Sequence, residues 1–197
     1  MNNLDALLKG YIDRFLDGNR VAGEMAQSLE EAGVGLMPLL DHCTIRTRDV
    51  DRRARQFLDL GYGYDDGIGV LEFNTWWAKV FRKPGHPTLF IDQAYAGERG
   101  RDSLIPQWVE AHGDECFHHI AILVENIDHA SGQLQDKGYD MAGAVVGGPG
   151  SDLRQVFTKP EIRNGEVYTV LELIERHNGY AGFLPPQADG LMESTRN

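Results

Sequence analysis

The feature that most constrains this chain is a repeat of its own sequence 77 residues further on. Residues 42–62 and 119–139, aligned without gaps, are identical at seven of 21 positions, whereas typical residue frequencies would give about one or two. A second match joins residues 80–84 (Val-Phe-Arg-Lys-Pro) to residues 156–160 (Val-Phe-Thr-Lys-Pro) at an offset of 76. The chain therefore contains two copies of one supersecondary unit. The identical pairs of the first match are His42/His119, Ile45/Ile122, Asp51/Asp128, Gln56/Gln133, Asp59/Asp136, Gly61/Gly138 and Tyr62/Tyr139.

Each copy has the pattern of a strand, a helix and three further strands. Apolar runs rich in β-prone residues predict the strands, and a segment that ends at Gly61 or Gly138 predicts each helix. The predicted elements are 39–47, 51–60, 69–73, 77–82 and 88–93 in the first copy, and 117–124, 128–137, 140–145, 153–158 and 166–174 in the second. Two βαβββ modules predict an α+β fold with a pseudo-symmetric cavity.

Five segments divide the chain. Residues 1–36 form an N-terminal extension in which apolar residues recur at helical spacing and predict two helices. The other segments are the first module at 37–95, a linker at 96–116 with a short helix near 105–111, the second module at 117–176, and a tail at 177–197 with a helix near 188–194. We expect the N-terminal helices to pack against the sheet or a partner subunit, and the second case would make a homodimer.

Charge and hydropathy narrow the possible partners. The formal net charge is −11, so nucleic acids and anionic membranes, which are polyanions, would be repelled. The apolar runs are too short for a signal peptide or a membrane span. We therefore expect a cytoplasmic protein that acts on a small molecule. Cys43 and Cys116 are expected to be buried free thiols.

Three residues have the types and positions of metal ligands. The repeat makes His42 and His119 equivalent on the first strand of each copy, so both imidazoles should face one cavity. Glu172 lies within an apolar strand, where a carboxylate is costly unless it is paired or bound to a metal. A carboxylate beside two histidines is a common ligand set for iron. The alternative for Glu172 is a buried ion pair with Arg154 or Arg163.

His118 competes with His119 for the role of ligand. Side chains alternate along a strand, so only one of these two neighbours can face the cavity. Since the repeat selects His119, we expect His118 to point away from the cavity.

Several of these segments resemble a known family. The runs at 119–122, 153–160 and 171–178, together with the Asp41-His42 pair, resemble the catalytic half of the 4-hydroxyphenylpyruvate dioxygenases in the vicinal oxygen chelate superfamily. The segment 42–46 is similar to the first-ligand segment of the 2-oxoadipate dioxygenase/decarboxylase family. The resemblance covers roughly residues 38–195.

The resemblance implies that the two modules form one open barrel, with the tail helix as a gate. It implies Fe(II) held by His42, His119 and Glu172, with Mn, Ni, Co or Zn as substitutes, and a 2-oxo acid and O₂ as substrates, with loss of CO₂. The tail departs from the family by inserting residues 184–186 (Leu-Pro-Pro) and by carrying Leu191 where an aromatic residue is expected. This departure favours an aliphatic or differently shaped 2-oxo acid over a phenyl compound.

The resemblance also implies substrate contacts. Gln155 and Phe157, two residues apart on one strand, would face the substrate, as would Phe183 from the tail. The alternative for Phe157 is a plain core position. The residues matched to them in the first copy, Lys79 and Phe81, would face the same cavity.

Arg46 shares a strand face with His42 and would bind a substrate carboxylate by resemblance, because guanidinium offers two parallel donors. The alternative is an ion pair at the strand end with Asp49 or Glu72.

Asp92 has two possible registers. In the first, Asp92 lies opposite Glu172 when the last strands of the two modules are compared. In the second, the comparison is shifted by one residue and Ile91 lies opposite Glu172. Facing the metal region, it would contact the substrate of a dioxygenase or act as a fourth ligand in a glyoxalase or epimerase. A metal-dependent lyase or isomerase of that kind, or a non-catalytic small-molecule-binding protein of the same superfamily, is the alternative to a dioxygenase.

Overall fold

The computed structural model of the chain describes residues 3–196. Its helices are α1 (Asn3–Gly18), α2 (Arg20–Glu31), α3 (Val50–Leu58), α4 (Ile105–His112), α5 (Ile127–Asp136) and α6 (Pro185–Ser194), with short 3-10 turns at Met37–Leu39 and Gly97–Gly100. Its strands are β1 (Leu40–Arg46), β2 (Gly63–Tyr64), β3 (Val70–Glu72), β4 (Trp76–Arg82), β5 (Thr88–Ala94), β6 (His119–Leu123), β7 (Leu153–Phe157), β8 (Ile162–Arg163), β9 (Glu166–Val167) and β10 (Val170–Arg176).

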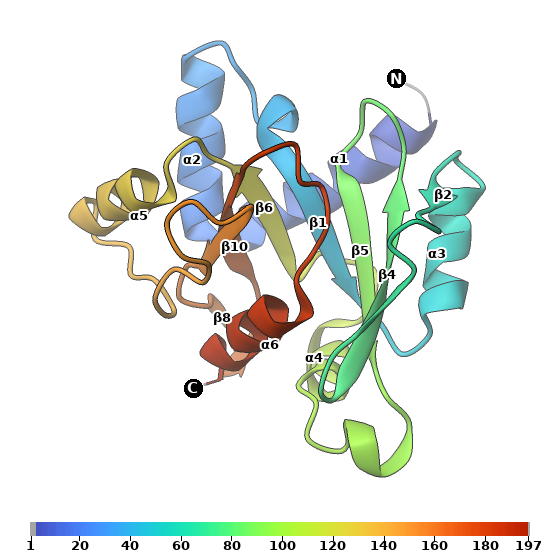
Figure 1. The fold of residues 1–197 in the computed structure, drawn as a ribbon. Coiled ribbons are helices and arrows are strands. Elements are labelled where there is room, and N and C mark those ends of the chain that lie inside the picture. The colour runs from blue at the N-terminus through green and yellow to red at the C-terminus, as the bar shows by residue number, and fades with distance from the viewer. Residues whose placement is uncertain (1–2, 197) are drawn as a thin grey trace.

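One mixed sheet carries both modules (Figure 1). Its strands run in the order β2-β4-β5-β1-β6-β10-β7, with β3 beside β4. In each module the first strand is parallel to the last, β1 to β5 and β6 to β10, while β1 and β6 lie antiparallel at the centre. The predicted α+β fold of two paired modules is confirmed, and the sheet stays open rather than closing into a barrel.

The repeat extends to the ends of the module helices. Asp49 caps the start of α3 and Asn126 caps the start of α5, each accepting a hydrogen bond from a backbone amide in the first turn. Such caps typically contribute about 1 kcal/mol. After each helix the chain turns at a glycine of positive φ, 93° at Gly61 and 87° at Gly138. Both module helices therefore begin at a side-chain cap and are followed by a glycine at matching positions of the repeat.

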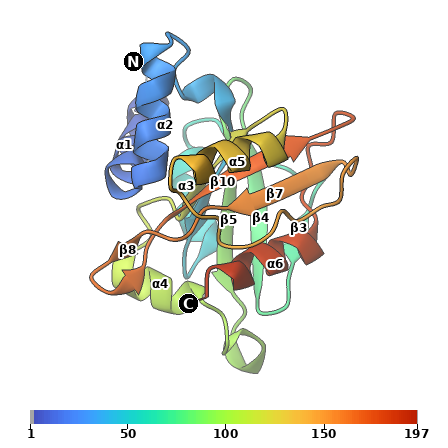
Figure 2. The ribbon, with the colours of Figure 1, turned by 90° about the vertical axis from the view of Figure 1, so that its left-hand side faces the viewer.

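The two faces of the sheet have different covers (Figure 2). Helices α1 and α2 lie on one side, where Tyr11 packs against Phe57 and Phe117 in the larger apolar core. Helix α6 lies on the other side, over a smaller cluster that includes Phe90 and Phe183. The N-terminal helices thus pack on their own sheet, and a homodimer stays a prediction.

Two strand predictions in the second module are wrong. The predicted strand 140–145 is reduced to an isolated bridge at Met141, with a second bridge just beyond it at Val146, because the Ala-Gly-Ala sequence at 142–144 has little tendency to form strands. The predicted strand 166–174 is broken into β9, which pairs with β8, and β10. The cysteine prediction is confirmed, since Cys43 and Cys116 are both buried and free. Within residues 3–196, no helix is both long and apolar enough to span a membrane.

Candidate metal centre

Three neighbouring strands bring the predicted ligands together. His42 lies on β1, His119 opens β6, and Glu172 lies on β10. Oε2 of Glu172 lies 3.2 Å from Nε2 of His42 and 3.3 Å from Nε2 of His119, and the two Nε2 atoms are 3.4 Å apart. His42 and Glu172 are buried and His119 is nearly so. The three ligand atoms therefore converge on one point of the cavity.

The spacing of these atoms suits a divalent cation. Metal–ligand bonds of about 2.1 Å at right angles separate adjacent ligand atoms by about 3.0 Å, close to the observed distances of 3.2–3.4 Å. Two imidazoles and one carboxylate on one side of a metal form the set found in non-haem Fe(II) oxygenases. These residues therefore fit a metal of this kind.

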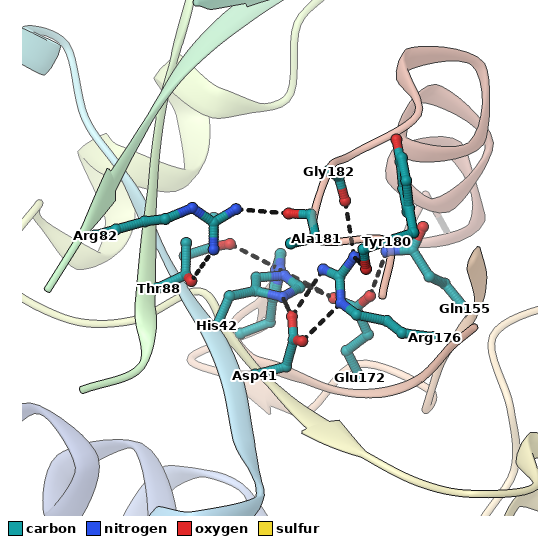
Figure 3. A network of polar contacts seen from close by, with 12 residues as sticks. Asp41, His42, Arg82, Thr88, Gln155, Glu172, Arg176, Tyr180, Ala181 and Gly182 are labelled. Atoms are coloured by element: carbon teal, nitrogen blue, oxygen red, sulfur yellow. Dashed lines mark hydrogen bonds and ion pairs between the residues drawn. The ribbon is translucent and has the colours of Figure 1, made fainter. Parts of the chain in front are cut away.

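A carboxylate and an arginine orient His42 from behind (Figure 3). Nδ1 of His42 lies 2.8 Å from Oδ1 of Asp41, and Arg176 donates to both oxygens of Asp41 at 2.7 and 2.9 Å. The contact between Arg176 and Asp41 could not be predicted from the sequence, because the two residues are 135 positions apart and nothing in the local pattern joins them. A carboxylate bound to the second nitrogen of a ligating histidine holds its ring orientation and tautomer.

The charges around His42 and His119 favour binding of a metal cation in place of a proton. Burial opposes the charged form of His42, but the carboxylates of Glu172 and Asp41 outweigh it and raise the pKa of His42 to about 9. Burial and the charges of His42 and Arg46 hold the pKa of His119 well below its ordinary value. A metal takes neutral imidazole, so its binding would release the extra proton that His42 carries below its pKa.

His118 lies in the cavity as well, so the prediction that it points away is wrong. Its Nδ1 lies 3.0 Å from Nδ1 of His119, and its side chain is buried against Trp108. Strand alternation fails here because β6 begins only at His119, not at the predicted Phe117. Nε2 of His118 is buried without a hydrogen-bond partner among residues 3–196.

Gln155 holds the carboxylate ligand. Its Nε2 donates to Oε1 of Glu172 at 2.6 Å, which leaves Oε2 facing the histidines. The alternative ion pair for Glu172 does not form in the described chain, because Arg154 pairs with Asp128 and Glu175 instead.

The pseudo-symmetric mate of Glu172 is Phe90. Thr44, the equivalent of Ala121, pairs with Phe90 on β5, whereas Ala121 pairs with Glu172 on β10. Asp92 therefore lies two positions beyond the mate of Glu172, and both registers predicted for it are wrong. Two steps along a strand keep the same face, so Asp92 still lines the cavity.

The prediction for Lys79 and Phe81 is also wrong. Lys79 pairs with Asp51 at 2.6 Å on the other face of β4, and Phe81 lies in the larger apolar core, away from the cavity. Strand pairing places Val80 opposite Phe90 and Phe157 opposite Glu172. Since Phe90 and Glu172 occupy equivalent positions, Val80 is the structural equivalent of Phe157, and the offset between these two strands is 77. The match of residues 80–84 with 156–160 is one residue out of structural register.

A small cavity lies beside the three ligands. Its volume is about 40 Å³, room for a few water molecules. Helix α6 and the segment before it contribute to its wall. The lining residues are His42, Thr44, Arg46, Trp76, Phe90, Asp92, His118, His119, Gln155, Phe157, Glu172, Phe183, Ala188, Leu191 and Met192. All five predicted substrate contacts are therefore cavity residues.

Two arginines hold the segment that leads into α6 (Figure 3). Arg82 donates to the carbonyl of Ala181 at 2.5 Å, and Arg176 donates to the carbonyl of Gly182 at 2.8 Å. The segment then seats Phe183 perpendicular to the ring of His42, with centroids 5.1 Å apart. The backbone of this cover is thereby tied to the sheet beside the ligands.

Arg46 and Asp92 are buried neighbours at the end of the cavity, and both side chains can carry a charge. They are register partners on β1 and β5, each only 2% exposed. Burial raises the pKa of Asp92 to about 7, although Arg46 opposes the shift, and burial lowers the pKa of Arg46 to about 10. Among residues 3–196, the Arg46 side chain donates only to Sδ of Met192, at 2.8 Å. The alternative partners of Arg46, Asp49 and Glu72, do not reach it there.

Sequence comparison matches most of the two modules to one family model. The model is described as the glyoxalase/bleomycin resistance protein/dioxygenase superfamily, and it matches residues 41–157. Among curated protein sequences, none matches this chain.

Solved structures share the fold at low sequence identity. A candidate hydrolase from Shewanella frigidimarina has a TM-score of 0.76 and 19% identity, with 94% of this chain and 99% of that chain covered. Hydroxyglutarate synthase from Oryza sativa, solved with 2-oxoadipate, has a TM-score of 0.72 and 16% identity, covering 98% and 91%. A variant of 4-hydroxymandelate synthase from Streptomyces coelicolor has a TM-score of 0.63 and 21% identity, covering 79% and 52%.

Proposed function

Since this chain belongs to the glyoxalase/bleomycin resistance protein/dioxygenase superfamily, we propose that it is a non-haem Fe(II)-dependent dioxygenase that decarboxylates a 2-oxo acid. The observation that carries the proposal is the asymmetry of the metal centre. Glu172 supplies a carboxylate from the second module, whereas its mate in the first module is Phe90. Three protein ligands on one side leave positions for substrate and O₂, and a fourth carboxylate would have filled one of them.

The residues around the ligands have supporting roles in this proposal. Fe(II), when bound, would supply the Lewis acidity and redox chemistry for the reaction of the 2-oxo acid with O₂. Asp41 holds the tautomer of His42, and Gln155 keeps one oxygen of Glu172 occupied so that the other faces the metal position. Phe90 and Phe157 form apolar walls that exclude water from the reacting groups.

Helix α6 is proposed to act as the gate. A cavity of about 40 Å³ is far smaller than the roughly 300 Å³ or more of ordinary ligand sites, so a 2-oxo acid can enter only if the cover moves. Leu191 and Met192 of α6 close the cavity, and Phe183 closes it beside His42. Arg46 would contact the end of the substrate that lies away from the metal.

The test is a set of turnover measurements with the metal-loaded protein. Protein loaded anaerobically with Fe(II) is mixed with O₂ and aromatic or aliphatic 2-oxo acids, and O₂ uptake and CO₂ release are followed together. One acid should give equal amounts of both, and His119→Ala should abolish both along with metal binding. No uptake with any acid, while His119→Ala leaves the metal content unchanged, would sink the proposal.

A metal-dependent isomerase or lyase is the second candidate, favoured by Asp92. A buried carboxylate whose pKa is raised to about 7 suits a general base near neutral pH. In this case the metal-loaded protein would turn over its substrate without O₂, and Asp92→Asn would abolish that turnover.

A further inference from the structure

Three buried polar atoms at one end of the cavity have no hydrogen-bond partner among residues 3–196. They are Nε of Arg46, Oδ1 of Asp92 and Nε2 of His118, and their side chains are between 1% and 2% exposed. A buried donor or acceptor that stays unpaired typically costs about 1–3 kcal/mol, so such groups usually have a ligand or water partner. All three side chains line the cavity that holds the candidate metal ligands.

The three atoms comprise donors and an acceptor. Nε of Arg46 can only donate, and an ionised Asp92 can only accept. A metal on Nε2 of His119 would leave the proton on Nδ1, which would donate to Nδ1 of His118 at 3.0 Å. The proton of His118 would then lie on Nε2, which makes this atom a second donor.

Above the pKa of Asp92, which burial raises to about 7, the charges of Arg46 and Asp92 at this end of the cavity nearly cancel. Arg46 and Asp92 are direct neighbours across β1 and β5, yet no ion pair between them is found in the described residues. An arginine alone would favour a carboxylate. With Asp92 ionised beside it, a second carboxylate in a buried site would be repelled by a like charge, and Oδ1 of Asp92 would still lack a donor.

We propose that Arg46, Asp92 and His118 form a distal subsite for an uncharged group that both accepts and donates hydrogen bonds, of which a carboxamide fits best. The carbonyl oxygen of a carboxamide has two lone pairs for the donors of Arg46 and His118, and its NH₂ group can donate to Asp92. Along β1, Arg46 lies four residues from His42, about 13 Å at the backbone. The amide thus lies at the end of the substrate remote from the 2-oxo acid group. This assignment rests on the proposed function.

The test compares two 2-oxo acids of six carbons that differ only at the far end, one a carboxylate and the other a carboxamide. Their binding to the Mn(II)-loaded protein is measured at pH 8 by calorimetry without O₂, so no turnover is needed. The wild-type protein should bind the carboxamide at least tenfold more tightly. Asp92→Asn should reverse the preference, while Asp136→Asn, which makes the same change on the exposed face of α5, should keep it.

The outcomes separate the subsite from the proposed function. Equal binding of the two acids, or tighter binding of the carboxylate by the wild-type protein, overturns the subsite while the 2-oxo acid assignment stands. If the metal binds but neither acid does, the proposed function fails and the subsite fails with it. Because the comparison of acids uses the wild-type protein, a variant that does not fold leaves the test intact.

Discussion

Replacing Phe90 by glutamate should change the metal centre from three protein ligands to four. Phe90 is the mate of Glu172 by strand register, and it is 5% exposed between the rings of His42 and Phe183. Loss of a buried phenylalanine ring costs about 3–5 kcal/mol, and an unpaired carboxylate in its place costs more. The metal-free variant should therefore lose at least about 3 kcal/mol of stability.

For a chain of 197 residues, 1 kcal/mol corresponds to about 2–4 °C in Tm. The metal-free Phe90→Glu protein should thus melt about 6–12 °C or more below the wild type. A bound metal would give the new carboxylate a partner, so the rise in Tm on adding Zn(II) or Co(II) should exceed that of the wild type. By the same reasoning, O₂ uptake should be lost, because a fourth protein ligand occupies a position that a reactant needs.

The assay is calorimetric melting of each protein with and without metal, together with a competition titration of metal affinity. Phe90→Gln is the matched control, since it removes the ring and adds the same length of side chain without the charge. If Phe90→Glu gains no more from metal than Phe90→Gln does, Phe90 does not occupy a ligand position and the reasoning is refuted.

Three further predictions concern the surroundings of the ligands. Asp41→Asn should weaken metal binding about 10–100-fold in a competition titration, because His42 loses the carboxylate that orients its ring. Unchanged affinity would contradict this role of Asp41. Gln155→Leu leaves Oε1 of Glu172 without its donor, so metal-free stability should fall by about 1–3 kcal/mol in denaturant melts, and an unchanged midpoint would count against the bond. The pKa of Asp92 is raised from 3.8 to about 7, so the folded protein binds more protons than the unfolded chain between these values, and its stability should fall as pH rises through this window. That gap corresponds to an upper bound of about 4 kcal/mol, and Asp92→Asn should flatten the slope in melts from pH 4 to 8; an equal slope in both proteins would rule out Asp92 as its source.

Much of the fold could be predicted because each copy of the repeat contains local sequence signals, such as helix caps and glycine turns, that act without tertiary contacts. The equivalence of His42 and His119, the helix of each module and the glycine that ends it all follow from patterns within about 20 residues. The identical offset of the two N-caps, Asp49 and Asn126, shows that the same local rules act in both copies.

The errors arise where tertiary pairing decides. Strand alternation assigned His118 to the wrong side because the strand begins at His119, two residues later than predicted. The match at an offset of 76 assigned Lys79 to the cavity, whereas the pairing of β4 with β5 follows an offset of 77. A one-residue shift of register moves every side chain to the opposite face, so a motif that matches well in sequence can still mislead.

The arginines that hold the surroundings of the ligands could not be found from the sequence alone. Arg176 reaches Asp41 across 135 residues and Arg82 reaches Ala181 across 99, and such contacts depend on how the two modules and the tail pack. The pairing of Arg46 with Asp92 likewise depends on the register of β1 with β5.

The fate of isotopically labelled O₂ tests the central claim most directly. The Fe(II)-loaded protein is supplied with labelled O₂ and the 2-oxo acid that it consumes, and the product is analysed by mass spectrometry. A decarboxylating dioxygenase should release one CO₂ for each O₂ consumed and place both labelled oxygen atoms in the organic product. Product that forms at the same rate without O₂, or that contains no label, would contradict the account and favour an isomerase or lyase.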